Sequence, residues 1–247
     1  MKPVKRRGAT STYQSVRGSF IAFIKKNKFK VGDRLPSETE LARILLVSRV
    51  TLREAIRQLR EDGFLYSSRG SGTYVAGNVT QIAGTLDVNH GTTRMITAAG
   101  FRPGVSGYEF ELTHAPQWLA EKLEVKKGCG IVLLKRVRTA DDSPVVVSMD
   151  YLGPRVATIF LSINERILSL FDMIEHSGIS FGSSFAELIP ENCSRDLAQK
   201  LDYRTGGPIL AMKQVIVDRK GVPLFYGEDY FRPDRFSFSI NRKRIEK

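Results

Sequence analysis

Cysteine and histidine are scarce in this chain, which has two cysteines and three histidines among 247 residues. Cys129 and Cys193 lie far apart, so they make neither a disulfide framework nor the paired spacing of a zinc site. His90, His114 and His176 are too scattered to form a recognisable triad or metal motif. A glycine-rich phosphate loop and a nucleophile elbow are also missing. We therefore expect no cofactor, no metal and no catalytic residue.

Long apolar runs are missing as well. No stretch approaches the roughly 18–20 residues that a membrane span needs, and no apolar segment follows the basic N-terminus as in a secretory signal. A hydrophobic content of 42% is nevertheless enough for buried cores, so a disordered chain is excluded. We expect a cytoplasmic protein without a membrane partner.

Positive charge is concentrated in the first third of the chain. The net charge is +12. Residues 1–77 hold 16 Lys and Arg against 6 Asp and Glu, and the remainder holds 22 against 20. This asymmetry predicts a module that binds a polyanion, joined to a nearly neutral one.

The segment 48–60 predicts a helix with two different faces. One face repeats apolar residues at the spacing of a buried stripe (Leu52, Ala55, Ile56 and Leu59). Another repeats arginines four or three residues apart (Arg49, Arg53, Arg57 and Arg60). Such a helix is held from behind and presents guanidinium groups outward, as reading a DNA major groove requires. A merely solvated basic face is the alternative for this helix taken alone.

The flanking segments favour the DNA interpretation. A first helix is expected over residues 12–27, and Ser37 with Glu40 forms a capping box for a second helix whose Leu41 and Ile44 face inward. After a short turn, Ser48 caps the basic helix, which completes a helix-turn-helix. Strands over 64–67 and 73–75, with a tight turn over 69–72, add a wing whose tip fits a minor groove. A purely structural hairpin is the alternative for the tip residues.

These residues carry a family resemblance. The motifs at 31–38, 48–55, 63–64 and 69–75 resemble the GntR family of bacterial transcription regulators. The resemblance implies a homodimer that binds double-stranded operator DNA with a short palindrome. It also implies a set of DNA-binding positions, in which Arg49 and Arg53 suit base edges while Ser37 and Thr51 suit phosphates. The full predicted set is Arg34, Ser37, Glu38, Ser48, Arg49, Thr51, Arg53, Arg57, Arg69, Gly70, Gly72 and Thr73.

The rest of the chain mixes short strands and helices, so the predicted fold class is α+β with a mostly antiparallel sheet in the second domain. We expect a winged helix-turn-helix domain over 1–77, a linker over 78–87 and an effector-binding domain over 88–247. Strands are expected over 107–113, 131–139, 145–151, 184–190, 208–218 and 222–231, and helices over about 94–99, 116–123, 164–175 and 195–201.

This second part resembles UTRA, the ligand-sensing domain of the HutC branch of GntR regulators, whose fold is similar to that of chorismate lyase. The resemblance is clearest at 134–138, 143–151, 221–223 and 230–236. It implies that a small effector binds here and controls the DNA-binding domain. A chorismate-lyase-like enzyme and a DNA-binding protein without a ligand are the alternatives.

Arg136 and Arg138 are two residues apart on a predicted strand, so both side chains leave the same face and need an anion or carboxylates beside them. Hydroxyls of Thr92 and Thr93, and the helix start near Arg94, add donors. The resemblance implies that Thr93, Arg136 and Arg138 hold an anionic group. The alternative is a solvent-facing pair neutralised by Glu187 or Glu228.

Three further positions of the effector site depart from sugar-sensing relatives. Ser148 and Phe225 stand where those relatives carry glutamates, and Phe231 stands where they often carry a tyrosine. We therefore predict a small anionic effector that is not an amino-sugar phosphate: an organic acid, a phosphonate-like anion or an acyl compound.

Overall fold

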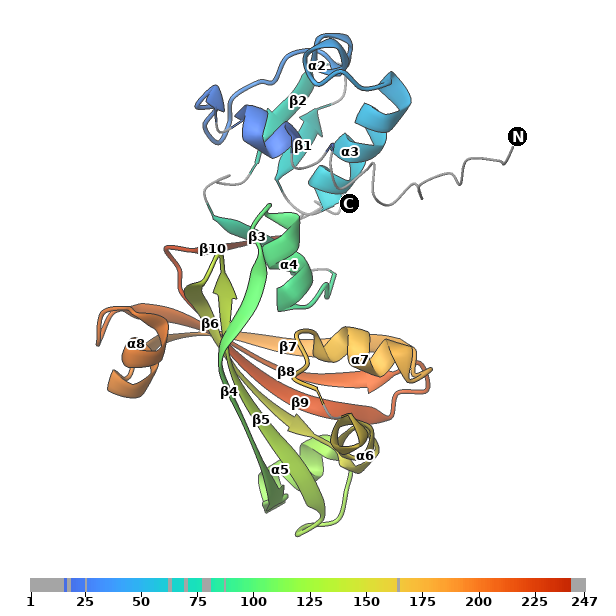
Figure 1. The fold of residues 1–247 in the computed structure, drawn as a ribbon, viewed down its shortest axis with the longest axis vertical. Helices are drawn as coiled ribbons and strands as arrows, with labels where there is room; N and C mark the ends of the chain where they lie inside the picture. Colours follow the sequence, from blue (N-terminus) through green and yellow to red (C-terminus); the bar gives the residue numbers. More distant parts are fainter. Residues whose placement is uncertain are drawn as a thin grey trace, which may run out of the picture. The chain divides into compact units, whose positions relative to one another are not determined.

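The computed structural model describes residues 16, 19–24, 26–61, 64–68, 71–76, 81–86, 88–163 and 165–240 (Figure 1). The chain divides into two compact units. The first comprises the described residues up to Asn89, residues 98–100 and those from Phe236 onward, and the second comprises 90–97 and 101–235. Among the described residues no helix is both long enough and apolar enough to cross a lipid bilayer.

The helices of the first unit pack through the stripes expected from the sequence. Residues 19–24 are helical and bury Phe20 and Ile24; part of the first expected helix lies outside the described residues. Two helices follow, α2 (Glu38–Ile44) and α3 (Arg49–Glu61). The four apolar residues of the α3 stripe are all buried, which confirms the helical period. Ile44 is exposed, contrary to expectation, because α2 ends there and turns only Leu41 and Ala42 inward.

Local hydrogen bonds fix both helix starts. The Ser37 hydroxyl accepts from the backbone N–H of Glu40, and the Glu40 carboxylate accepts from the Ser37 backbone N–H at 2.9 Å, which is the expected capping box. Ser48 caps α3 in the same way, its Oγ accepting from Thr51 N–H at 3.1 Å. Leu46 between the helices has φ +54°, a left-handed conformation that reverses the chain in the short turn.

The wing is an antiparallel hairpin of β1 (Leu65–Ser68) and β2 (Gly72–Val75). Gly72 has φ +122°, and a Cβ there would lie 3.0 Å from Nε of Arg34. Only glycine fits this position without strain, since both the backbone and the neighbouring guanidinium exclude a side chain. Arg34 also pairs with Tyr74 through an isolated bridge, so the wing and the segment before α2 support each other.

A second small sheet joins two distant parts of the sequence. Within the expected linker, Ile82–Thr85 form β3, and this strand pairs in parallel with β10 (Phe236–Ser239). Both strands belong to the first unit. The chain therefore returns to the first unit after completing the second.

The second unit is built on a six-stranded sheet in the order β4-β5-β6-β9-β8-β7, with every neighbouring pair antiparallel. This confirms the mostly antiparallel α+β fold. The β4 and β7 strands form its two edges. The strands are β4 (Pro103–His114), β5 (Gly130–Ala140), β6 (Ser143–Leu152), β7 (Phe181–Asn192), β8 (Pro208–Asp218) and β9 (Pro223–Phe231).

Helices cover both faces of this sheet. On one face lie α6 (Pro154–Ser162) and α7 (Leu170–His176) (Figure 1). They bury even-numbered residues of β5, such as Val132 and Leu134. On the other face, α5 (Gln117–Leu123) and α8 (Arg195–Leu201) cover odd-numbered residues of β5, such as Ile131 and Val137. A further helix, α4 (Thr92–Ala98), precedes β4 and starts two residues before its expected position.

One expected helix is wrong in its first half. Residues 165–169 are not helical, because Ser169 caps α7 and its Oγ accepts from Asp172 N–H at 3.1 Å. The helix that the sequence reading missed is α6, which Pro154 begins at its first position. The non-helical segment 165–169 then crosses the sheet face that carries the candidate site.

Candidate functional site

In the first unit, α3 presents its arginines to solvent opposite its buried stripe, and Arg49, Arg53, Arg57 and Arg60 are all exposed. They differ in their partners. Arg53 Nε donates to Glu38 at 2.7 Å, and Arg57 donates to Glu54 at 2.6 Å within the same helix. Hydrogen bonds from Arg57 and Gln58 lower the pKa of Glu54 to about 2. Neither Arg49 nor Arg60 has an acceptor within the described part of the chain, and of the two only Arg49 lies in the first turn of α3.

The hydroxyls predicted to touch phosphates lie near this surface but already serve as caps. Ser48 Oγ and Thr51 Oγ1 are 2.7 Å apart, and Ser37 Oγ contacts the Glu40 carboxylate at 2.8 Å. Thr73 lies on β2 of the wing and its carbonyl accepts from Leu35 N–H at 2.8 Å. Arg69 and Gly70 at the wing tip lie outside the described residues.

Sequence reasoning missed two apolar side chains on this surface. Val50, between Arg49 and Thr51, is 78% exposed, and Leu46 in the turn is 91% exposed. The helical period that buries Leu52 places Val50 outward, so the signal was available. An exposed valine here supplies an apolar contact of the kind that reads a thymine methyl group.

In the second unit, Arg136 and Arg138 both leave β5 on the face covered by α6 and α7, as the strand period predicts. Both are almost completely buried, with 3% and 2% exposure. The alternative of a solvent-facing pair neutralised by Glu187 or Glu228 is therefore wrong. Glu228 belongs to the opposite face of the sheet and accepts hydrogen bonds from Tyr226 and Tyr230.

The two guanidinium groups are only partly satisfied. Arg136 Nη2 donates to Asp150 at 2.5 Å, and Arg138 Nη2 donates to the Thr93 hydroxyl. Three buried donor atoms, Arg136 Nε and Nη1 and Arg138 Nε, contact no acceptor among the residues that the structure describes. Buried N–H groups without an acceptor are costly, more so when they are charged. The cluster is therefore short of acceptors.

Of the three residues predicted at the start of the helix (Thr92, Thr93 and Arg94), only Thr93 contacts the arginine cluster in the part of the chain described. Thr93 accepts from Arg138, and its Oγ1 donates to Leu168 carbonyl at 3.1 Å, which ties α4 to the segment 165–169. Thr92 is the first residue of α4 and is half-buried. Arg94 lies exposed on α4, and no contact joins it to the cluster in the part of the chain described.

Carboxylates do reach this site, from positions that the sequence reading did not name. Asp150 follows Ser148 by two residues on β6, and Ser148 donates to Asp229, its cross-strand neighbour on β9. These two acids stand at positions other than 148, 225 and 231, where the sequence places a serine and two phenylalanines. Phe225 and Phe231 share the β9 face with Asp229 and are buried, and Phe225 packs edge-on against Phe171.

Burial changes the acid–base behaviour of the cluster. Desolvation, together with the charge of Arg136, lowers the pKa of Arg138 to about 9, so this group stays charged at neutral pH. Desolvation and the nearby Asp150 raise the pKa of Asp229 to about 6, while the Ser148 hydrogen bond opposes this shift. Protonation of Asp229 as the pH falls therefore removes one negative charge from the cluster.

This titration predicts a pH dependence for anion binding. Affinity for methanesulfonate, which does not titrate in this range, is expected to rise severalfold between pH 7.5 and pH 5, because protonation removes the Asp229 charge beside Arg138. Isothermal titration calorimetry of the whole chain measures it. The Asp229→Asn variant should bind methanesulfonate at both pH values with the affinity that wild type shows at pH 5. If this variant keeps the wild-type pH dependence, another group is responsible for it.

Comparisons with known proteins agree with both parts of this description. A family model described as "UTRA domain" matches residues 98–237, and one described as "Bacterial regulatory proteins, gntR family" matches residues 12–75. The HTH-type transcriptional regulator Rv0792c of Mycobacterium tuberculosis is 28% identical over 96% of this chain and 88% of its own length. The HTH-type transcriptional repressor NagR of Bacillus subtilis is 26% identical over 95% of this chain and 96% of its own.

Among solved structures, the crystal structure of PhnF from Mycobacterium smegmatis is similar over 93% of this chain and all of that chain, with a TM-score of 0.61 and 24% identity. At that identity the likeness concerns the fold. Because the match covers 93% of this chain, it includes residues of both units.

Proposed function

This chain belongs to the gntR family of bacterial regulatory proteins and carries a UTRA domain, and from that premise we propose that it is a repressor controlled by a small anion bound at Arg136 and Arg138. Membership of this family makes it a DNA-binding transcription regulator rather than an enzyme. Its sensing domain binds an effector, and the proposal concerns which residues bind it and what its chemistry is.

The observation that carries the proposal is the shortage of acceptors around two buried arginines. Three N–H donors point into a cluster that offers them no acceptor within the described residues. A carboxylate, sulfonate, phosphonate or phosphate supplies several oxygens at once and forms charge-assisted hydrogen bonds with guanidinium groups. The Thr93 hydroxyl accepts from Arg138 and donates its one proton to the Leu168 carbonyl, so it holds this guanidinium in place for the anion.

The carboxylates of the cluster limit what else the effector carries. Asp150 is engaged by Arg136, and Asp229 by Ser148. Phe225 and Phe231 add apolar surface rather than acceptors for sugar hydroxyls. This composition supports an organic acid, a phosphonate-like anion or an acyl compound over an amino-sugar phosphate.

On the DNA side, we propose a cytoplasmic homodimer that places two α3 helices in successive major grooves, about 34 Å apart. Arg49 and Arg53 contact base edges, and the hydroxyls and the wing contact the backbone and the minor groove. The effector changes operator affinity only by as much as it prefers one arrangement of the dimer over the other.

Arg138→Gln tests the anion site while keeping a side chain of similar length. An operator is first selected from random duplexes with the purified chain, and binding is followed by fluorescence anisotropy during titration with organic acids, phosphonates and N-acetylglucosamine 6-phosphate. The variant should bind operator like wild type but need about tenfold more of the active anion, since one charge-assisted hydrogen-bonding group is lost.

Arg219→Gln is the matched control, because it removes an exposed arginine from the β8–β9 turn. It should respond to the anion like wild type. The anion site is contradicted if Arg138→Gln responds to the anion like wild type. It is also contradicted if this variant loses operator affinity but keeps its response to the anion. Activity of the amino-sugar phosphate alone contradicts the proposed effector class.

A further inference from the structure

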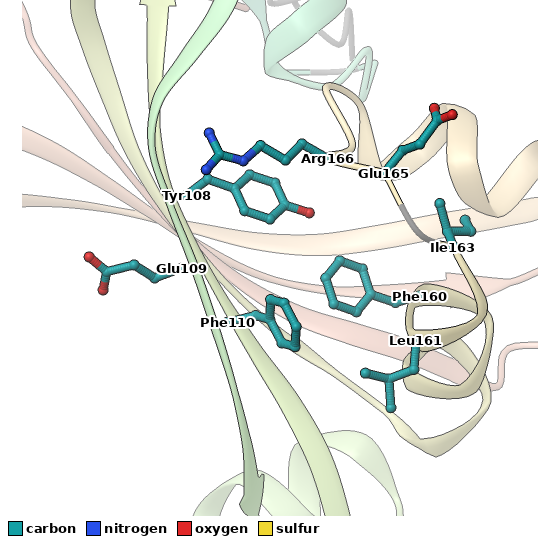
Figure 2. Close-up of a pocket in the computed structure, with 8 residues that line it drawn as sticks. All are labelled: Tyr108, Glu109, Phe110, Phe160, Leu161, Ile163, Glu165 and Arg166. Carbon is teal, nitrogen blue, oxygen red and sulfur yellow. The ribbon is translucent and has the colours of Figure 1, made fainter.

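A pocket of about 520 Å³ opens between the edge strand β4 and helix α6 (Figure 2). Its volume lies within the range of small-molecule sites in proteins. Figure 2 shows side chains of both elements converging on it, while Glu109 points away on the other side of β4. Its main lining residues are Tyr108, Phe110, Phe160, Leu161, Ile163 and Arg166.

The wall of this pocket includes apolar side chains that remain in contact with water, beside the polar groups of Tyr108, Glu165 and Arg166. Phe110 is 52% exposed and Leu161 is 49% exposed. Phe110 meets Phe160 edge-on, with ring centroids 5.2 Å apart, which leaves part of each ring facing the pocket. Covering this surface with an apolar group removes it from water, which is favourable in proportion to the area.

The pocket adjoins the arginine cluster through one residue. Tyr108 lines the pocket and is the cross-strand partner of Arg136 in the β4–β5 register. Directly opposed residues of an antiparallel pair lie on the same face, with Cβ atoms about 4.5–5.5 Å apart. The pocket and the unsatisfied Arg136 donors are therefore one strand apart on one face of the sheet.

The segment 165–169 contacts both the pocket and the arginine cluster. Arg166 lies over the Tyr108 ring at 5.7 Å, and Ile167 N–H donates to Tyr108 Oη at 3.4 Å. One residue further, the Leu168 carbonyl accepts from Thr93, the partner of Arg138. One short segment thus contacts the pocket at its start and the anion cluster at its end.

We infer that the pocket holds the apolar part of the effector whose anionic part lies on Arg136 and Arg138. The effector class is an amphipathic anion, an acid carrying an alkyl, acyl or aryl group. This inference rests on the proposed anion site and adds a second, apolar subsite to it. Two features support this occupant. Tyr108 lines the pocket and is the cross-strand partner of Arg136, and Phe110 with Leu161 supplies exposed apolar surface on the same side of β4.

A series of alkanesulfonates tests the subsite, because the head group stays constant while the tail grows. Methane-, butane- and hexanesulfonate are titrated into the whole chain by calorimetry. Affinity should increase about fourfold for each methylene that enters the pocket. In Phe110→Ser this gain with tail length should largely disappear, while methanesulfonate binds as in wild type.

Phe185→Ser is the matched control, since Phe185 is a 76% exposed phenylalanine on the opposite edge strand β7. It should keep the full gain with tail length. Equal affinity for all three sulfonates, or loss of the gain in Phe185→Ser as well, overturns the inference. A Phe110→Ser variant that changes the oligomeric state but not the gain shows that the pocket is an interface, which also overturns it.

Failure of the underlying anion site gives a different result. If tail length matters and Phe110→Ser abolishes the gain, but Arg138→Gln binds every sulfonate like wild type, the apolar subsite exists without the proposed anion site. If Arg138→Gln weakens all three sulfonates equally and tail length has no effect, the anion site stands and the subsite does not.

Discussion

The Arg136→Ala variant is expected to lose about 3–5 kcal/mol of unfolding free energy, because it leaves the Asp150 carboxylate buried without its partner. Both side chains are nearly inaccessible, and their contact is 2.5 Å. Urea unfolding monitored by tryptophan fluorescence measures this loss of stability in the second unit, which contains Arg136. Trp118 is the single tryptophan of the chain and packs against Tyr151 and Tyr226 in the second unit.

The double variant Arg136→Met with Asp150→Leu provides the control, since replacing a buried pair by apolar groups is often neutral or stabilising. It should unfold at a urea concentration close to that of wild type, yet bind no anion. An Arg136→Ala variant as stable as wild type would show that Asp150 does not depend on Arg136 as its partner. For this reason Arg138, rather than Arg136, is the position suited to binding tests.

Removing the Arg49 side chain is expected to weaken operator binding by about 1–3 kcal/mol, or up to about a hundredfold in Kd. Its guanidinium has no acceptor among the described residues and stands at the start of the exposed face of α3. Binding to random duplexes should weaken much less. On random DNA the protein is held by phosphate contacts, and Arg49 has no specific base contact there to lose. Anisotropy at a fixed, near-physiological salt concentration measures both affinities.

Arg60→Ala is the matched control, an exposed arginine in the last turn of the same helix. It should lower operator affinity far less than Arg49→Ala. Equal losses on selected and random DNA would place Arg49 on phosphates. Arg53→Ala has a second effect, because it also releases Glu38, the acid that holds its guanidinium at 2.7 Å.

Local periodicity was enough to predict the parts of both sites that lie within a single element. The 3.6-residue period separated the buried stripe of α3 from its arginines, and the two-residue period placed Arg136 and Arg138 on one face. The capping box at Ser37 needed only a four-residue motif. In each case the physical cause lies in the covalent geometry of one helix or strand.

The partners of Arg136 and Arg138 could not be predicted from local sequence patterns. Asp150 and Asp229 meet Arg136 and Arg138 only because β6 and β9 follow β5 in the sheet, and a register is set by the whole sheet. The same holds for the pocket, which needs Phe110 of β4 to face Phe160 of a helix that the sequence reading missed. Sequence predicted the donors, whereas tertiary pairing supplied the acceptors and the apolar wall.

The parallel pairing of β3 with β10 has a practical consequence for dissecting the protein. A fragment that stops before Phe236 would expose the hydrogen-bonding edge of β3, and exposed edges invite association with other chains. A sensing fragment excised at residue 88 would, conversely, carry β10 without its mate. Both strands belong to the first unit, so point substitutions keep a pairing of that unit that either cut would break.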